Sequence, residues 1–311
     1  MPVHPLLAAK FPLLEGFSSF GELLADPAFA EFERPPVPDV VPEVSTVDAQ
    51  VPGPHGPVPV RIYRSGDQES APCLVWLHGG AFRMGDLDMR EADRVARELA
   101  HRAGIVVVSV DYRLAVGPVS YPVPHDDVVA ALRWVRDHAG DLGVGRISAG
   151  GASAGGNLSA GAALRLRDDD GWLPAALALV YPVLHPQLPS LPASLVARMT
   201  EVPPILHFPP AAVRATTENY LGGPVSRADG YAMPGLAMLE GLCPTLVLTA
   251  EYDDLRVSGQ VFAGQLAGAG VDVRHVVVPS LLHGFLNLPP AIDEVGRALD
   301  LIIESVRPAG T

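Results

Sequence analysis

The sequence has little cysteine, no long uninterrupted apolar run and no excess of positive charge. Its two cysteines, Cys73 and Cys243, each lie beside a hydrophobic run, so we expect reduced core residues rather than a disulfide framework. A formal net charge of −13 argues against nucleic acid or an anionic membrane surface as a partner. No apolar run is long enough to cross a bilayer, which predicts a protein without a membrane span.

The N-terminal residues carry no recognisable targeting signal. They lack a basic region and a clear cleavage site, so we expect no export signal and a cytoplasmic protein. Apolar residues make up 48% of the 311-residue chain, which is enough to bury a large core in one large α/β domain or in two smaller ones.

A G-x-S-x-G pentapeptide at residues 151–155 is the most informative motif. It follows a predicted short strand and opens a predicted helix, which is the context of a nucleophile elbow. A sharp reversal there would expose the hydroxyl of Ser153 and hold its backbone at an unfavourable φ, while Gly151 and Gly155 would leave room for strand and helix to pack. Gly-Ala-Ser runs also occur in ordinary loops and tight helix contacts, so the pentapeptide alone leaves its role open.

Strand-like and helix-like segments alternate along most of the chain. Strands are predicted at residues 58–63 (an edge strand), 73–77, 105–110, 146–150, 176–180, 245–250 and 271–278. Helices are predicted at residues 88–103, 126–139, 154–167, 257–269 and 291–306. This alternation predicts an α/β fold with a mostly parallel central sheet and helices on both of its faces.

Two segments interrupt the alternation. Residues 1–45 and 185–235 are irregular and contain several prolines, with short helices predicted at 13–20, 21–32 and 211–220. We interpret both as parts of one lid over the functional edge of the sheet. The predicted organisation is 1–45 as the N-terminal part of a cap, 46–184 as the first part of the core, 185–235 as a cap insertion and 236–311 as the second part of the core.

Acidic residues and a histidine follow the last two predicted strands. Glu251, Asp253 and Asp254 come after strand 245–250, and His283 comes after strand 271–278. Active residues gather at the carboxyl ends of parallel strands, and the order serine, acid, histidine is that of the α/β-hydrolase triad. An imidazole with a pKa near 6.5 can take and return the serine proton, and a carboxylate fixes its tautomer. Position alone does not separate Asp253 from Asp254.

A second glycine-containing loop lies upstream. His78, Gly79, Gly80, Ala81 and Phe82 directly follow the buried strand 73–77. Glycines there let the backbone approach a ligand and turn its N–H groups inward as oxyanion donors. A plain Gly-Gly turn is the alternative interpretation.

Five blocks in this order resemble the hormone-sensitive-lipase-like esterases (bacterial family IV), from about Leu74 to Leu286. The blocks are residues 78–82 with 85–88 (similar to HGGG), 111–115 with Tyr121-Pro122 (similar to DYRLAPE…P), the elbow (similar to GDSAGGNL), 253–256 (similar to DPLR) and 283–285 (similar to HGF). The resemblance implies an α/β-hydrolase fold with a helical cap.

The resemblance also implies roles for individual residues. Ser153 takes the position of the nucleophile, Asp253 that of the orienting acid and His283 that of the base. The implied oxyanion donors are the backbone amides of Gly79, Gly80 and Ala154. The substrate pocket is expected to include the following residues: Ala81, Phe82, Phe208 and Phe285.

Three departures from the family pattern lie close to these blocks. Ala152 stands where the family usually has aspartate or threonine, Ala81 replaces the third glycine of HGGG, and Val116-Gly117 replaces Pro-Glu. None of them replaces a residue of the triad. They bear on the shape of the pocket and on the rate more than on the class of reaction.

Together these features predict a serine carboxylesterase acting on short- to medium-chain carboxylic esters through an acyl-enzyme intermediate. The expected partner is a small-molecule ester, with no metal ion or organic cofactor, and a homodimer is one assembly that the sequence allows. Acyl transfer or amide hydrolysis by the same triad is an alternative, because an acyl-enzyme does not dictate its acceptor. A non-catalytic receptor on a hydrolase scaffold is a third, although all three triad candidates are present.

Overall fold

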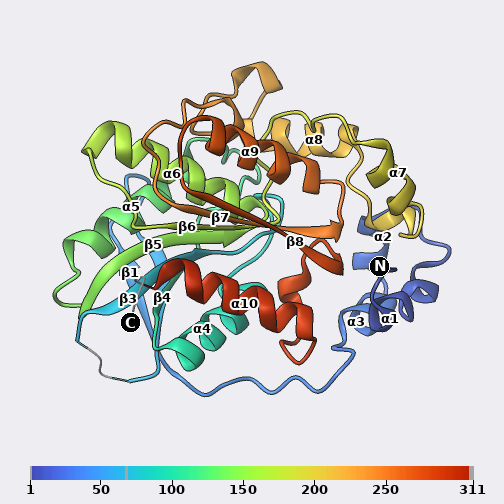
Figure 1. Cartoon of the computed structure of the whole chain (residues 1–311), viewed down its shortest axis with the longest axis horizontal. Helices are drawn as coiled ribbons and strands as arrows, with labels where there is room; N and C mark the ends of the chain where they lie inside the picture. Colours follow the sequence, from blue (N-terminus) through green and yellow to red (C-terminus); the bar gives the residue numbers. More distant parts are fainter. Residues whose placement is uncertain (1, 67–68, 308–311) are drawn as a thin grey trace.

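The computed structural model describes residues 2–66 and 69–307 and is built around one eight-stranded sheet (Figure 1). Residue 1 of the predicted segment 1–45, residues 67–68 of 46–184 and residues 308–311 of 236–311 therefore lie outside the described residues. The strand order is β1-β2-β4-β3-β5-β6-β7-β8. The strands are β1 (Ser45–Val51), β2 (Val58–Arg64), β3 (Ala71–Leu77), β4 (Val106–Val110), β5 (Val144–Ala152), β6 (Leu177–Val180), β7 (Thr245–Tyr252) and β8 (Val273–Leu282).

The sheet is parallel from β4 through β3 to β8, and only β1 and β2 run antiparallel to their neighbours. Every residue of β4 and β6 is buried. Their sequences, VVVSV and LALV, are accordingly apolar without alternation, as expected for strands covered on both faces. The predicted mostly parallel sheet is thus present.

Helices cover both faces of the sheet (Figure 1). On one face, α4 (Val95–Ala103) and α10 (Asp293–Val306) contribute Leu99 and Ile302 to a buried apolar cluster. On the other face, α5 (Val123–Asp137), α6 (Ala154–Asp170) and α9 (Arg256–Gly268) contribute residues such as Leu132 and Leu158 to the second cluster. Among the described residues, no helix combines the length and the apolar character needed to cross a bilayer.

The structure corrects several sequence predictions near the chain's irregular parts. Strand β2 is not an edge strand, because β1 pairs with it along its whole length and takes the edge position. Four of the seven residues of β1 are exposed in a row, so its sequence gave no alternating pattern to detect. The segment predicted as helix 88–103 begins as a π-helical turn, η2 (Arg90–Arg94), before it becomes α4.

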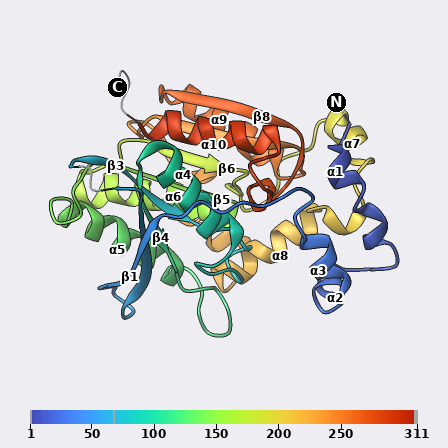
Figure 2. The ribbon, with the colours of Figure 1, turned by 90° about the horizontal axis from the view of Figure 1, so that it is seen from below.

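The N-terminal region and the segment after β6 come together in space (Figures 1 and 2). The first holds α1 (Pro5–Ala8), α2 (Phe20–Leu24) and α3 (Ala28–Glu33), and the second holds α7 (Ala193–Met199) and α8 (Pro210–Leu221). Helices α1 and α7 were not predicted, and most of the predicted helix 13–20 is turn or irregular. These short helices lie at the end of the molecule toward which β7 and β8 point (Figure 1).

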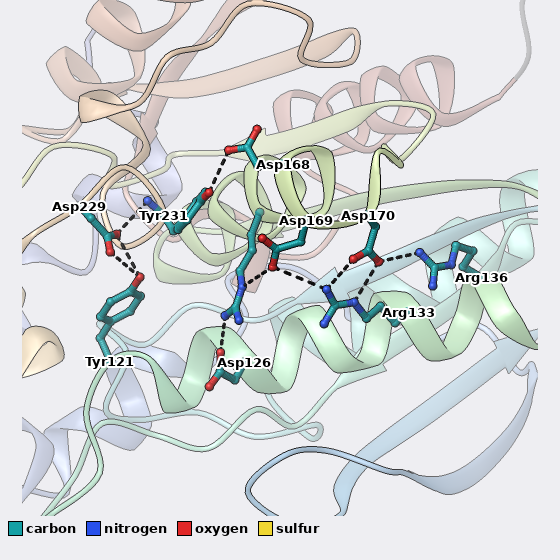
Figure 3. Close-up of polar contacts among 10 residues, drawn as sticks. Tyr121, Asp126, Arg133, Arg136, Asp168, Asp169, Asp170, Asp229 and Tyr231 are labelled. Atoms are coloured by element: carbon teal, nitrogen blue, oxygen red, sulfur yellow. Dashed lines mark hydrogen bonds and ion pairs between the residues drawn. The ribbon is translucent and has the colours of Figure 1, made fainter.

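An ion-pair network on the surface joins α5 to α6 (Figure 3). Arg133 of α5 donates to Asp170 of α6 at 2.6 and 3.0 Å, and Arg136 donates to the same carboxylate at 2.7 Å. The hydrogen bond from Arg133 lowers the pKa of Asp170 to about 2. Exposed ion pairs of this kind each contribute little to the free energy of unfolding. Their position matters more, since α6 is the helix that begins directly after Ser153.

Candidate active site

Ser153 lies at a sharp turn between β5 and α6. Its backbone has φ 53° and ψ −114°, a conformation that L-residues rarely adopt outside functional sites. A Cβ placed on Gly151 would lie 2.5 Å from the carbonyl carbon of Gly155, and one on Gly155 would lie 2.2 Å from the Leu77 carbonyl oxygen. Glycine is therefore required on both sides, because the strand and the helix cross too closely for side chains.

The structure brings Ser153, His283 and Asp253 together at the carboxyl ends of β5, β8 and β7. The Ser153 hydroxyl lies 3.0 Å from Nε2 of His283, and Nδ1 of His283 lies 2.8 Å from Oδ2 of Asp253. With Nδ1 protonated and donating to the carboxylate, Nε2 is left as the acceptor for the serine proton. Three residues far apart in the sequence thus form the contacts of a serine–histidine–acid triad.

The geometry separates the two neighbouring aspartates. Asp253 is 1% exposed, and its Oδ1 accepts the amide of Leu255 at 2.9 Å, which leaves Oδ2 pointed at His283. The carboxylate of Asp254 instead accepts the amide of Phe208 at 2.8 Å, in the segment before α8. Asp253 is the residue placed to orient the imidazole, and Asp254 joins the core to residues 185–235.

The environment of His283 favours the charged imidazole. Burial by itself lowers the pKa of His283, but the charge and hydrogen bond of Asp253, together with the charge of Glu91, outweigh burial and raise the pKa above its ordinary value. The rings of Tyr181 and Phe208 pack against the imidazole, with centroids 4.8 and 4.7 Å away. These neighbours restrict the ring to the orientation that both hydrogen bonds require.

The assignment of Gly79 to the oxyanion hole is wrong. Its N–H donates to Oε1 of the buried Glu91 at 2.6 Å and is therefore not free to bind a developing oxyanion. The sequence did not reveal this contact, because Glu91 lies 12 positions further on in the segment predicted as helix 88–103.

The next two amides of the loop fit that role better. The N–H groups of Gly80, Ala81 and Ala154 form no hydrogen bond with other described residues. Gly80 and Ala81 adopt positive φ values of 107° and 55°. Ala154 is the first residue of α6, so its amide belongs to the positive end of that helix. These three amides are therefore available as donors, and Ala81 replaces Gly79 among the candidates for the oxyanion hole.

The departures from the family pattern lie in three different environments. Ala81 occupies a left-handed conformation that glycine adopts without strain, so the methyl group makes the conformation of this loop less favourable. Ala152 is fully buried at the end of β5. Val116 is 51% exposed on a surface loop.

Two of the four predicted pocket residues do not line a pocket. Phe82 is 0% exposed and stacks on Tyr220 with ring centroids 4.0 Å apart, and Phe285 is 1% exposed and packs edge-on against Tyr181. Neither ring offers surface to a substrate, because Phe82 belongs to one buried apolar cluster and Phe285 to the other. Phe208 and Ala81 are half-buried and remain candidates.

A cavity of about 710 Å³ lies between the N-terminal helices and the segment after α7. Its lining is mainly apolar and includes Phe11, Leu14 and Phe17 from one side and Pro203 and Ile205 from the other. In the described part of the chain, no group of three or more histidine, cysteine, aspartate or glutamate side chains is arranged to hold a metal ion.

Fold and site together define an α/β-hydrolase: a mostly parallel sheet with a strained serine at a strand–helix elbow, a histidine and an acid in the order of that class. The chain matches the family model described as alpha/beta hydrolase fold over residues 74–287.

Relatives of known name agree with this class. The chain is 37% identical to esterase LipI of Mycobacterium tuberculosis over 84% of this chain and 82% of that protein. It is 30% identical to an ethyl acetate hydrolase of Pseudomonas putida over 99% of both. A crystal form of an esterase from Pyrobaculum calidifontis matches with a TM-score of 0.80 and 31% identity over 98% of both chains.

The chain therefore belongs to the hormone-sensitive-lipase-like family of α/β-hydrolases, as the five sequence blocks predicted. The predictions of fold class and of a carboxylic ester hydrolase are confirmed with it.

Proposed function

We propose that this protein hydrolyses short- to medium-chain carboxylic esters, with Ser153 as nucleophile, His283 as general base and Asp253 as orienting acid. The observation that carries the proposal is the continuous hydrogen-bonded path from the Ser153 hydroxyl through His283 to Asp253. A serine hydroxyl is a weak nucleophile unless a positioned base removes its proton, and this path supplies the base.

The reaction would follow from the same contacts. Nε2 of His283 takes the proton of Ser153 as its Oγ attacks the ester carbonyl carbon. The carbonyl oxygen becomes negative and is held by the free amides of Gly80, Ala81 and Ala154, where each donor is typically worth about 3 to 4 kcal/mol. His283 then returns the proton to the leaving alcohol. Water activated by His283 attacks the acyl-enzyme and releases the acid.

We propose that residues 1–45 and 185–235 form one cap over this site, with the core in residues 46–184 and 236–311. Support comes from the cavity that both segments line and from their links to the core. His4 donates its amide to the Ser280 carbonyl at 2.8 Å, and Arg198 of α7 forms an ion pair with Glu251 at the end of β7.

The same cavity supports an apolar substrate. Ile205, one of its lining residues, lies three positions before Phe208, whose ring packs against His283. We propose that the hydrocarbon part of the ester occupies it. The named relative that acts on ethyl acetate supports the short end of the chain-length range.

Labelling tests the proposed nucleophile. An alkyl fluorophosphonate should modify wild-type protein at Ser153 in a one-to-one ratio, and Ser153→Ala should take no label and lose about 10⁶-fold in kcat. Absence of label on wild-type protein with a cooperative melting transition would count against the nucleophile. A series of p-nitrophenyl esters from acetate to laurate then measures how deep the pocket is.

The same assay separates hydrolysis from acyl transfer. A transferase would pass the acyl group to an added alcohol or amine faster than to water, whereas we expect the free acid to dominate. We also propose that the protein acts in the cytoplasm, without a nucleic-acid partner, and forms a homodimer. Light scattering during size-exclusion chromatography tests the assembly.

A further inference from the structure

The buried carboxylate of Glu91 has no part in the reaction steps given above. Glu91 lies in the π-helical turn η2, between β3 and α4, and is 3% exposed. The Trp76 indole N–H donates to the Glu91 carbonyl oxygen at 2.7 Å and fixes the backbone there. A buried ionisable group is costly unless its polar atoms are satisfied, and π-helical turns occur often at functional sites.

Three donors converge on this carboxylate. Oε1 accepts the amide of Gly79 at 2.6 Å, and Oε2 accepts the Tyr181 hydroxyl at 2.8 Å and the Asn287 side-chain amide at 3.3 Å. The backbone N–H of Glu91 donates in return to Oδ1 of Asn287 at 3.2 Å. Donors alone surround Glu91 among the described residues, which is the arrangement that suits an ionised carboxylate.

Glu91 also explains why residue 79 is glycine. A Cβ at that position would lie 2.4 Å from Oε1 of Glu91, so any side chain there would displace the carboxylate. The glycine that the sequence indicated as an oxyanion donor instead makes room for the group that holds the loop. The free amides of Gly80 and Ala81 follow directly from this anchored residue.

The other two contacts of Glu91 lead to the catalytic histidine. Asn287 donates to the carbonyl oxygen of Gly284, the residue after His283, at 3.1 Å. Tyr181 packs its ring against the imidazole and has a strained backbone with φ 37°. One carboxylate thus connects the oxyanion loop on one side of the reacting carbon with the histidine loop on the other.

We propose that Glu91 is a positioning residue that sets the oxyanion loop and the His283 loop in register with each other. The inference rests on the proposed esterase function. Glu91 acts through Gly79, Tyr181 and Asn287 and not on the substrate directly. Its loss should therefore lower kcat, by weakening stabilisation of the transition state, more than it raises KM.

Its negative charge has a second effect. The charged groups that face His283 are Asp253 and Glu91, while Ser153, Tyr181 and Phe208 contribute uncharged side chains. Burial raises the pKa of Glu91, and the hydrogen bonds of Tyr181, Gly79 and Asn287, together with the charge of His283, oppose that rise. An anion there favours the imidazolium, so its removal should lower the pKa of His283.

The main test compares Glu91→Gln with Glu98→Gln. Glutamine is nearly isosteric but has one acceptor oxygen where glutamate has two, so its N–H₂ would face either the Gly79 amide or the donors Tyr181 and Asn287. Glu98 is the matched control, because it is also buried (5% exposed) and, among the described residues, its carboxylate bonds Arg94 and Arg102 of its own helical segment and neither active-site loop.

We expect Glu91→Gln to lower kcat about 10- to 100-fold with KM within about threefold, as for a misplacement of reacting groups near 1 Å. The pKa on the acidic side of the kcat/KM–pH profile, which reports His283, should fall. Inhibition by an alkyl trifluoromethyl ketone, which forms an oxyanion on Ser153, should weaken by the same factor as kcat/KM. Glu98→Gln should lose thermal stability without these kinetic changes.

Asn287→Ala gives an independent variant, since this half-buried side chain carries one arm of the network. It should show a smaller loss in the same direction, and the double variant with Glu91→Gln should lose less than the product of the two. The proposal is overturned if both single variants keep wild-type kcat, ketone affinity and pH profile, or if Glu98→Gln loses as much activity as Glu91→Gln. Wild-type protein that neither takes up a fluorophosphonate nor hydrolyses esters would refute the proposed function itself.

Discussion

The substitution Asp253→Asn tests the electrostatic core of the site with almost no change in shape. The Asp253 carboxylate accepts the Leu255 amide through Oδ1 and the His283 Nδ1–H through Oδ2. In the variant, the amide oxygen would keep the Leu255 bond, so the side-chain N–H₂ would face Nδ1. The imidazole would then have to accept at Nδ1 and carry its proton on Nε2.

This tautomer cannot take the proton of Ser153, because Nε2 lies 3.0 Å from Oγ and would already be protonated. A wrong tautomer of this kind lowers kcat by about 10⁴, which equals about 5.4 kcal/mol of lost transition-state stabilisation. Asp254→Asn is the matched control. Its amide oxygen can still accept the Phe208 N–H, and we expect kcat/KM within about tenfold of wild type.

The assay is steady-state hydrolysis of p-nitrophenyl butyrate, normalised to active sites titrated with a fluorophosphonate and accompanied by thermal melts. The reasoning would be refuted if Asp253→Asn kept activity within tenfold of wild type while Asp254→Asn lost a thousandfold. In that case Asp254 would be the carboxylate that orients His283, and the hydrogen bond between Asp253 and His283 would not be the functional one.

Two further predictions use the pKa direction of His283 and the strain at Ala81. Because the free base is required and its pKa lies above the ordinary value of about 6.5, kcat/KM should fall about tenfold per pH unit below that raised pKa. A profile that is flat from pH 5 to 8 would contradict a histidine base. Ala81→Gly should raise the free energy of unfolding by about 0.5 to 1 kcal/mol, because glycine adopts φ 55° without strain. The control Ala215→Gly, at an exposed position inside α8, should instead lower it by about 1 kcal/mol in the same calorimetric scan, and equal effects would argue against strain at residue 81.

The elements that the sequence predicted well are those whose signal is local. The apolar runs of β3, β4 and β6 and the amphipathic α10 were found within a few residues of their bounds. The strand β1 and the helix α7 were missed, because exposed residues in β1 and prolines around α7 hide any periodic pattern. Their conformation depends on the sheet edge and on the rest of the proposed cap.

The same division runs through the active site. The sequence by itself predicted that Ser153 and His283 meet at one end of the sheet, because a strand–serine–helix turn requires particular glycines next to Ser153 and because strand ends converge in a parallel sheet. Only the tertiary structure decided which amides stay free and which phenylalanines are enclosed in the core, and it places Asp253, the acid that the family resemblance implied, at His283. Those outcomes depend on where a backbone N–H or a ring finds its partner, and here the partner of Gly79 is Glu91, a side chain that packing brings in from another segment.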